Sequence, residues 1–271
     1  MNRLRPLDRD LVVKGLRLRC LDWGGEGRTP LLLLHGFTGH AHAWDTLAIA
    51  LQPHFRVYAL DQRGHGDSDP ADVYNPVVAF DDLSGVLEQL SLTSLVMVGL
   101  SMGGRNAMYF TAQRPTAVQK LVVVDIGPEI SAKASAPSSG PPEPPTWDSI
   151  EQAARHLYRG NPYPGIHYYR WVVTTSLRER PEGGLVWKWH PTVKTLRSQA
   201  PIDWWDLLRG LTPPTLVLRG AESTVLDRDV AERMGRELPH GTFVEIPRAV
   251  HTLHEDNPDA VVAALREFLK F

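Results

Sequence analysis

Short apolar segments alternate with longer amphipathic segments through the first 125 residues of the chain. Runs without charged residues predict strands that are buried on both faces, as in a parallel sheet. Four such runs lie at residues 31–34, 57–60, 95–98 and 121–124. Before them, segments 12–13 and 16–20 predict an opening pair of strands that turns at Gly15.

The segments between these runs have helical periodicity. Helices are predicted over 43–51, 77–90 and 102–113, the last ended by Pro115. Near the C-terminus the same alternation predicts strands 215–218 and 243–246 and helices 229–237 and 259–269. Because consecutive parallel strands need crossover connections, this order predicts an α/β fold with a mostly parallel, twisted sheet flanked by helices.

The middle of the chain interrupts the α/β pattern. Residues 128–145 contain six of the 22 prolines, a composition that does not support a helix interior or a sheet ladder. Residues 147–211 contain six of the eight tryptophans. We therefore predict a core formed by residues 1–126 and 211–271, and an inserted, mainly helical cap at 127–210 with a proline-rich flap at 137–145.

Composition narrows the functional classes. The formal net charge of −2 over 271 residues provides no basic surface for nucleic acid, and no apolar run approaches the length of a membrane span. The N-terminus has no apolar segment typical of a secretory signal, and the single Cys20 excludes an internal disulfide. We expect a cytoplasmic protein that acts on a small molecule.

The segment 99–103 reads Gly-Leu-Ser-Met-Gly and matches the G-x-S-x-G pattern. It follows one predicted strand and opens a predicted helix, which is the context that this motif requires. Flanking glycines allow close backbone approach, and the helix N-terminus supplies N–H groups that stabilise a developing oxyanion. The alternative is a glycine-rich connection without chemistry, which the surrounding strand and helix disfavour.

Four motifs in order resemble those of the α/β-hydrolase superfamily. They are His-Gly-Phe-Thr-Gly at 35–39, Asp-Gln-Arg-Gly-His-Gly-Asp-Ser at 61–68, Gly-Leu-Ser-Met-Gly-Gly at 99–104, and the run from His251 to Pro258. The resemblance extends over essentially the whole chain. It implies the α/β-hydrolase fold, with Ser101 as nucleophile and His251 as general base. It also implies an oxyanion hole formed by the N–H groups of Phe37 and Met102, and no cofactor or metal.

The third member of the triad departs from the usual pattern. Most of the family carries an aspartate after the seventh strand, but Ser223 occupies that position here. A minority places the acid after the sixth strand, where this chain has Asp125. We assign Asp125 as the acid, with Glu222 and Asp227 as alternatives whose spacing fits less well.

A serine nucleophile indicates acyl transfer and excludes the dehalogenases and epoxide hydrolases of this fold, which use a carboxylate. We expect a serine hydrolase that cleaves carboxylic esters of small to medium, partly apolar substrates. Lactones stay open as a second class of substrate, because they present the same ester group. The alternatives are a cofactor-free perhydrolase, a carbon–carbon bond hydrolase of the same fold, and a receptor with slow turnover. Multiple turnovers on an acyl ester, as opposed to a single burst, distinguish enzyme from receptor.

The aromatic residues of the predicted cap have two interpretations. They can build the core of a small cap, or they can line an apolar substrate pocket above Ser101. We predict that Trp147, Trp171, Trp187 and Trp189 contribute to substrate binding, and that the flap at 137–145 gates access. The histidines in segment 40–45 have the wrong spacing for a dinuclear zinc site, so no metal is predicted there.

Overall fold

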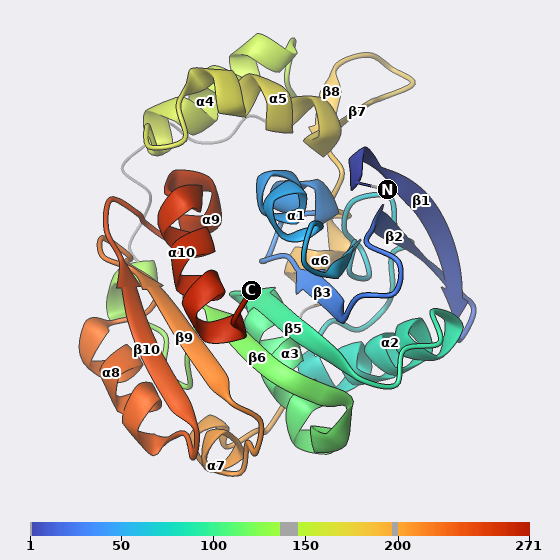
Figure 1. Ribbon diagram of the computed structural model, residues 1–271. Coiled ribbons are helices and arrows are strands. Elements are labelled where there is room, and N and C mark those ends of the chain that lie inside the picture. The colour runs from blue at the N-terminus through green and yellow to red at the C-terminus, as the bar shows by residue number, and fades with distance from the viewer. Residues whose placement is uncertain (1, 136–145, 197–199) are drawn as a thin grey trace.

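The computed structural model describes residues 2–135, 146–196 and 200–271. An eight-stranded sheet runs through the molecule in the order β1-β2-β4-β3-β5-β6-β9-β10 (Figure 1). The strands are β1 (Asn2–Val13), β2 (Leu16–Gly24), β3 (Pro30–Leu34), β4 (Arg56–Leu60), β5 (Leu95–Leu100), β6 (Val118–Val124), β9 (Thr215–Gly220) and β10 (Gly241–Ile246). Only β1–β2 and β2–β4 pair antiparallel in this sheet, so the predicted α/β-hydrolase fold is confirmed.

Helices cover both faces of this sheet. Short helix α1 (Asp45–Leu51) and α10 (Pro258–Leu269) pack on one face. Helices α2 (Pro76–Gln89), α3 (Met102–Gln113) and α8 (Arg228–Glu237) pack on the other. Side chains alternate between the two faces along each central strand. Leu32 belongs to the core on the side of α2, α3 and α8, and Leu33 to the core on the side of α1 and α10. This explains why the central strands read as continuous apolar runs.

Strand β1 is longer than the predicted segment 12–13. Its outer part is charged, and these charges pair across to β2: Arg19 lies 2.6 Å from Asp8 and 2.9 Å from Asp10. Cross-strand ion pairs suit an exposed edge strand, which needs no apolar run. The apolar pattern therefore marks only the end of β1 that packs on α2.

The inserted segment forms a small unit at one end of the sheet, with α4 (Ile150–Gly160) and α5 (Ile166–Ser176) at the top of Figure 1. A hairpin of β7 (Leu177–Glu179) and β8 (Leu185–Trp187) adjoins them. The remaining helices are η1 (Ala41–Trp44), η2 (Pro115–Ala117), η3 (Ala132–Ser135), α6 (Thr192–Thr195), α7 (Trp204–Arg209) and α9 (Leu253–Asp256). The predicted flap at 137–145 lies outside the described residues. In the part of the chain that the structure describes, no helix combines the length and apolarity needed to cross a membrane.

Candidate active site

Ser101 stands on a strained turn between β5 and α3. Its φ of 53° lies in the left-handed region, which a residue with a side chain occupies only when its surroundings impose it. The surroundings here are close backbone contacts: a Cβ on Gly103 would lie 2.3 Å from the carbonyl oxygen of Leu34, and one on Gly99 would lie 2.4 Å from that of Gly103. The glycines of the motif are therefore required for β5, α3 and β3 to pack this closely.

His251 lies in the loop between β10 and α9 and contacts the carboxylate of Asp125 at the end of β6. The distance from His251 Nδ1 to Asp125 Oδ2 is 2.7 Å, and Asp125 is fully buried. Because a carboxylate accepts the hydrogen bond, Nδ1 carries the proton and Nε2 is the basic nitrogen of the neutral ring. This arrangement equips the imidazole to take a proton on its Nε2 side.

A cavity of about 280 Å³ brings the predicted catalytic residues together. Ser101 and His251 both line it, as do Phe37 and Met102. Met102 opens α3, and the first N–H groups of a helix have no partner within the helix, so they are suited to a developing negative charge. The structure thus gathers all the residues assigned to the triad and the oxyanion hole.

The two alternative acids point elsewhere. The side chain of Glu222 accepts a hydrogen bond of 2.5 Å from the hydroxyl of Tyr163 in the cap. Asp227 accepts one of 3.0 Å from Ser131. Asp125, by contrast, contacts His251 directly, so its position after β6 agrees with the geometry expected of the acid.

Ser223 makes a contact that sequence reasoning did not anticipate. Its hydroxyl donates to Asp125 Oδ2 over 2.5 Å, and the backbone N–H of Gly220 donates to Oδ1 over 3.1 Å. The N–H of Val225 donates to the Ser223 oxygen, so the hydroxyl proton is directed to the carboxylate. The signal in the sequence was the place of Ser223 at the usual acid position, which indicated proximity to His251 but not this role.

A buried polar network supports the loop that carries Phe37. The amide of Asn106 donates to Gln62 over 2.7 Å, and the Gln62 amide donates to the carbonyl of His35 over 2.7 Å. The Gln62 N–H donates to Nε2 of His35, whose Nδ1 then donates to the Gly36 carbonyl. Burial holds the pKa of His35 well below its ordinary value, so the ring stays neutral. The network links α3 to the loop that carries Phe37.

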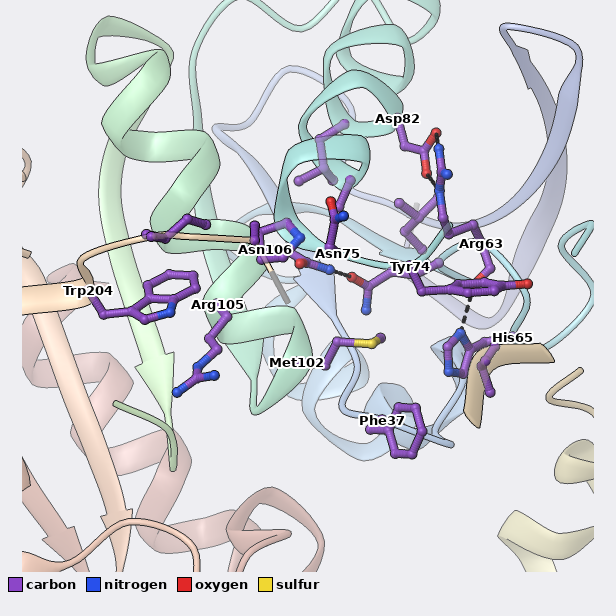
Figure 2. Close-up of a pocket in the computed structure, with 18 of the residues that line it drawn as sticks. Phe37, Arg63, His65, Tyr74, Asn75, Asp82, Met102, Arg105, Asn106 and Trp204 are labelled. Carbon is purple, nitrogen blue, oxygen red and sulfur yellow. Dashed lines mark hydrogen bonds and ion pairs between the residues drawn. The ribbon is translucent and has the colours of Figure 1, made fainter. Parts of the chain in front are cut away.

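A second, larger cavity of about 570 Å³ adjoins the first (Figure 2). The two share four lining residues, which are Phe37, Met102, Arg105 and Ile130. On the core side, polar residues contribute to the lining of the larger cavity: Gln62, Arg63, His65 and Asn106. On the opposite side the lining comes from residues that precede the last two strands: Val193, Ala200, Ile202 and Trp204. The segment between the cap helices and the last strands thus contributes to its wall.

The four tryptophans predicted to bind substrate are not among the residues that line these two cavities. Trp147 is buried in the core of the cap, and its ring centroid lies 5.6 Å from that of Trp187. Trp171 is 53% exposed, and Trp189 lies beneath the ammonium group of Lys194. Aromatic residues here chiefly build the cap. Trp204, which does line the larger cavity, was not singled out because sequence alone does not show which ring faces the core.

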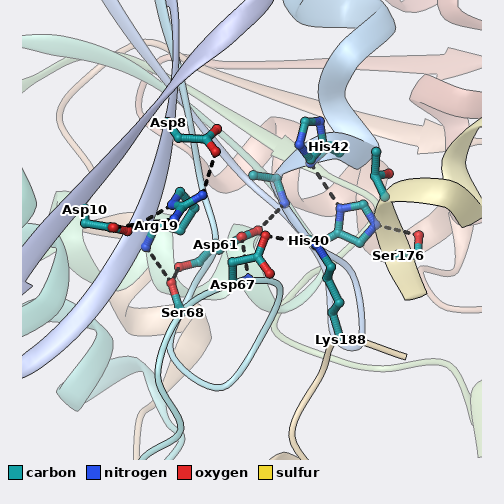
Figure 3. Close-up of polar contacts among 12 residues, drawn as sticks. Asp8, Asp10, Arg19, His40, His42, Asp61, Asp67, Ser68, Ser176 and Lys188 are labelled. Carbon is teal, nitrogen blue, oxygen red and sulfur yellow. Dashed lines mark hydrogen bonds and ion pairs between the residues drawn. The ribbon is translucent and has the colours of Figure 1, made fainter. Parts of the chain in front are cut away.

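Several hydrogen bonds hold the cap against the loops of the site. Asn161, at the end of α4, donates to Asp256 Oδ1 over 2.6 Å, and the other oxygen of Asp256 accepts from the N–H of Val250 over 2.8 Å. On another side His40 contacts Ser176 at 2.6 Å, and Lys188 pairs with Asp67 at 2.9 Å (Figure 3).

The ring of His40 is therefore part of the contact between core and cap, and burial lowers its pKa to about 3. His42 contacts Asp45 at 3.0 Å. Within the described ranges, no group of three or more His, Cys, Asp or Glu side chains is arranged to hold a metal ion.

Comparison with known proteins identifies the family of this chain. The sequence profile of the alpha/beta hydrolase family matches residues 31–264. The sn-1-specific diacylglycerol lipase ABHD11 of Mus musculus is 31% identical over 98% of this chain and 86% of its own. The 2-(acetamidomethylene)succinate hydrolase of Mesorhizobium japonicum is 28% identical over 90% and 89%, and Esterase Rv0045c of Mycobacterium tuberculosis is 29% identical over 97% and 90%. A crystal structure of E-2-(acetamidomethylene)succinate hydrolase superposes with a TM-score of 0.84 at 24% identity, covering 98% of this chain and 100% of that one.

Proposed function

The chain belongs to the alpha/beta hydrolase family, and we propose that it hydrolyses carboxylic esters through an acyl-enzyme formed on Ser101. One observation carries the proposal. His251, with its Nδ1 held 2.7 Å from the buried Asp125, lines the same cavity as the strained Ser101. A hydroxyl nucleophile, an oriented base and a helix N-terminus at one cavity are the requirements of acyl transfer.

In the first half-reaction, the oxygen of Ser101 attacks the ester carbonyl while Nε2 of His251 takes the hydroxyl proton. The carbonyl oxygen becomes an oxyanion, which the N–H groups of Phe37 and Met102 stabilise. When the intermediate collapses, the C–O bond to the alcohol breaks and His251 gives its proton to the departing oxygen. Asp125 stays ionised and stabilises the imidazolium that exists in between.

In the second half-reaction, water replaces the alcohol. His251 removes a proton from the water while the water oxygen attacks the carbonyl carbon of the acyl-enzyme. The same N–H groups stabilise the second oxyanion. Collapse then breaks the bond to Ser101, which recovers its proton from His251, and the carboxylic acid leaves. The residues of the site suffice for every proton transfer in this sequence.

The names of the relatives support ester hydrolysis as the reaction class. Relatives over most of this chain are named as an esterase, as a putative esterase/lipase and as a diacylglycerol lipase. Linear esters of small to medium acids fit cavities of about 280 and 570 Å³. Lactones present the same carbonyl to Ser101, so they belong in the substrate panel.

The test is multiple-turnover hydrolysis of p-nitrophenyl esters and lactones by the intact protein. We expect many turnovers per molecule, and labelling of the wild type by a fluorophosphonate that the S101A variant loses together with turnover. A stoichiometric burst alone would favour a receptor. Turnover that survives S101A would exclude the serine mechanism.

A further inference from the structure

We propose that the 570 Å³ cavity receives an aliphatic acyl chain of medium length, and that Ala79, on the wall formed by α2, sets the longest chain that fits. The inference rests on the proposed function, since a substrate has acyl and alcohol sides only in acyl transfer. It adds to that function the class of acyl group and the residue that limits its length.

The position of His251 sets the direction of binding. The same imidazole that accepts the serine proton must give it to the departing alcohol, so the alcohol lies on the His251 side of the tetrahedral centre. His251 lines the smaller cavity and is not among the residues that line the larger one. The larger cavity shares Phe37 and Met102 with the smaller one, so the two meet where the carbonyl group lies. The larger cavity is therefore the space available to the acyl chain.

The lining of the larger cavity suits hydrocarbon, because most of the residues that form it are apolar. Several polar side chains in its wall are paired with one another. Asn106 donates to Gln62 over 2.7 Å, and Arg63 contacts Asp82 at 2.6 and 2.7 Å. An aliphatic chain that lies against these pairs breaks neither of them, and the transfer of its methylene groups out of water is favourable.

The far end of the cavity lies between β4 and α2. Leu60, the last residue of β4, and Leu83 of α2 line the larger cavity alone, and both belong to the core beneath α2. In Figure 2, Phe37 and Met102 lie at one end of the group of residues, and Asp82, which marks α2, lies at the other. An acyl chain that passes Phe37 and Met102 thus extends toward α2.

Ala79 is the smallest residue on the face of α2 that borders the cavity. This face is formed by residues at intervals that place them on one side of a helix: Asn75, Ala79, Asp82 and Leu83. Ala79 is only 8% exposed but belongs to neither core of the sheet, so its methyl group borders the cavity. A longer side chain at this position would project into the cavity and shorten it.

The experiment compares p-nitrophenyl butanoate with p-nitrophenyl octanoate, which have the same leaving group. For the wild type we expect kcat/KM to be about tenfold or more higher with the octanoate, because four further methylene groups leave water. In A79L the octanoate-to-butanoate ratio of kcat/KM should fall about tenfold, since the leucine side chain occupies the space of the distal methylene groups. V77L, which changes an exposed residue of the same helix that lines neither cavity, should keep the wild-type ratio.

A second variant, L83A, tests the opposite change. Removal of the leucine side chain lengthens the far end of the cavity, so the dodecanoate-to-octanoate ratio of kcat/KM should rise at least about threefold above that of the wild type. A general loss of stability does not move the two variants in opposite directions, and circular dichroism shows which of them folds. A wild-type ratio in either folded variant would overturn the inference alone.

A third comparison moves the chain to the alcohol side, with octyl acetate and ethyl acetate as substrates. The octyl-to-ethyl ratio of kcat/KM should be the same in A79L and in the wild type. A tenfold fall of this ratio in A79L, with the acyl ratio unchanged, would place the alcohol in the larger cavity and overturn the inference. Absence of hydrolysis of any ester by the wild type would overturn it together with the proposed function.

Discussion

The hydroxyl of Ser223 and the ring of His251 share one acceptor, the Oδ2 atom of Asp125, at 2.5 and 2.7 Å. Strands β6 and β9 are parallel neighbours, so residues that follow them meet at one edge of the sheet. Ser223 occupies the position at which most of the family carries its acid. The serine therefore acts here as a donor that orients the carboxylate of the neighbouring strand.

This relationship predicts that substitution of Asp125 lowers kcat far more than substitution of the other two candidate carboxylates. D125N should lower kcat by about 10³-fold or more, because an amide favours the wrong tautomer of His251. E222Q and D227N should stay within about threefold of the wild type, since these residues contact Tyr163 and Ser131 instead. Initial rates on a p-nitrophenyl ester provide the measurement. A larger loss in E222Q or D227N than in D125N would show that another residue orients the base.

A carboxylate at position 223, after β9, should be able to replace the one at position 125, after β6. In the double variant D125N/S223D, a carboxylate at position 223 lies beside the atom that now receives His251. We expect kcat at least tenfold above that of D125N, though below the wild type. D125N/S223N, which supplies the same shape without the charge, serves as the control. Equal kcat values for the two double variants would indicate that position 223 does not reach the imidazole.

A third prediction concerns Glu255 on α9, which contacts Tyr168 of the cap. Burial raises the pKa of this carboxyl to about 7 from its ordinary value of 4.5. Between these values the folded state binds more protons than the unfolded state, so the contribution of Glu255 to the unfolding free energy falls as pH rises from about 4.5 to 7. The unfolding free energy of E255Q should therefore exceed that of the wild type by about 3 kcal/mol at pH 8, and the two should be nearly equal at about pH 4.5.

Urea denaturation at the two pH values measures this difference. Subtracting wild type from variant separates Glu255 from the buried histidines, whose lowered pKa values act in the opposite direction. E88Q, on the exposed side of α2, should match the wild type at both pH values. An unfolding free energy of E255Q that is no higher than that of the wild type at pH 8 would contradict the prediction.

The predicted strands and the order of the motifs could be read from the sequence because both are local. A buried parallel strand needs an unbroken apolar run, and the turn at Ser101 needs glycines where backbones approach closely. The contact between Asp125 and His251 could be anticipated because Ser223 breaks the usual pattern. That Ser223 contacts Asp125 depends on pairing between β6 and β9, which are separated by the whole inserted segment.

The lining of the cavities could not be read in the same way. Trp147 and Trp204 both belong to the aromatic segment 147–211, and the sequence does not distinguish their roles. In the structure the first is buried in the cap and the second lines the larger cavity. Which ring faces which space depends on how the inserted segment packs on the core, and no periodic pattern encodes that packing. The charged part of β1 was missed for a related reason, since its ion pairs replace apolar burial.

The contact between Asn161 and Asp256 joins the cap to the loop that carries His251. Asp256 also accepts the N–H of Val250, the residue directly before His251. Because Asp256 joins a cap side chain to the backbone next to the imidazole, the placement of His251 depends on the cap as well as on the core. The cap therefore has a share in orienting His251, in addition to covering the site.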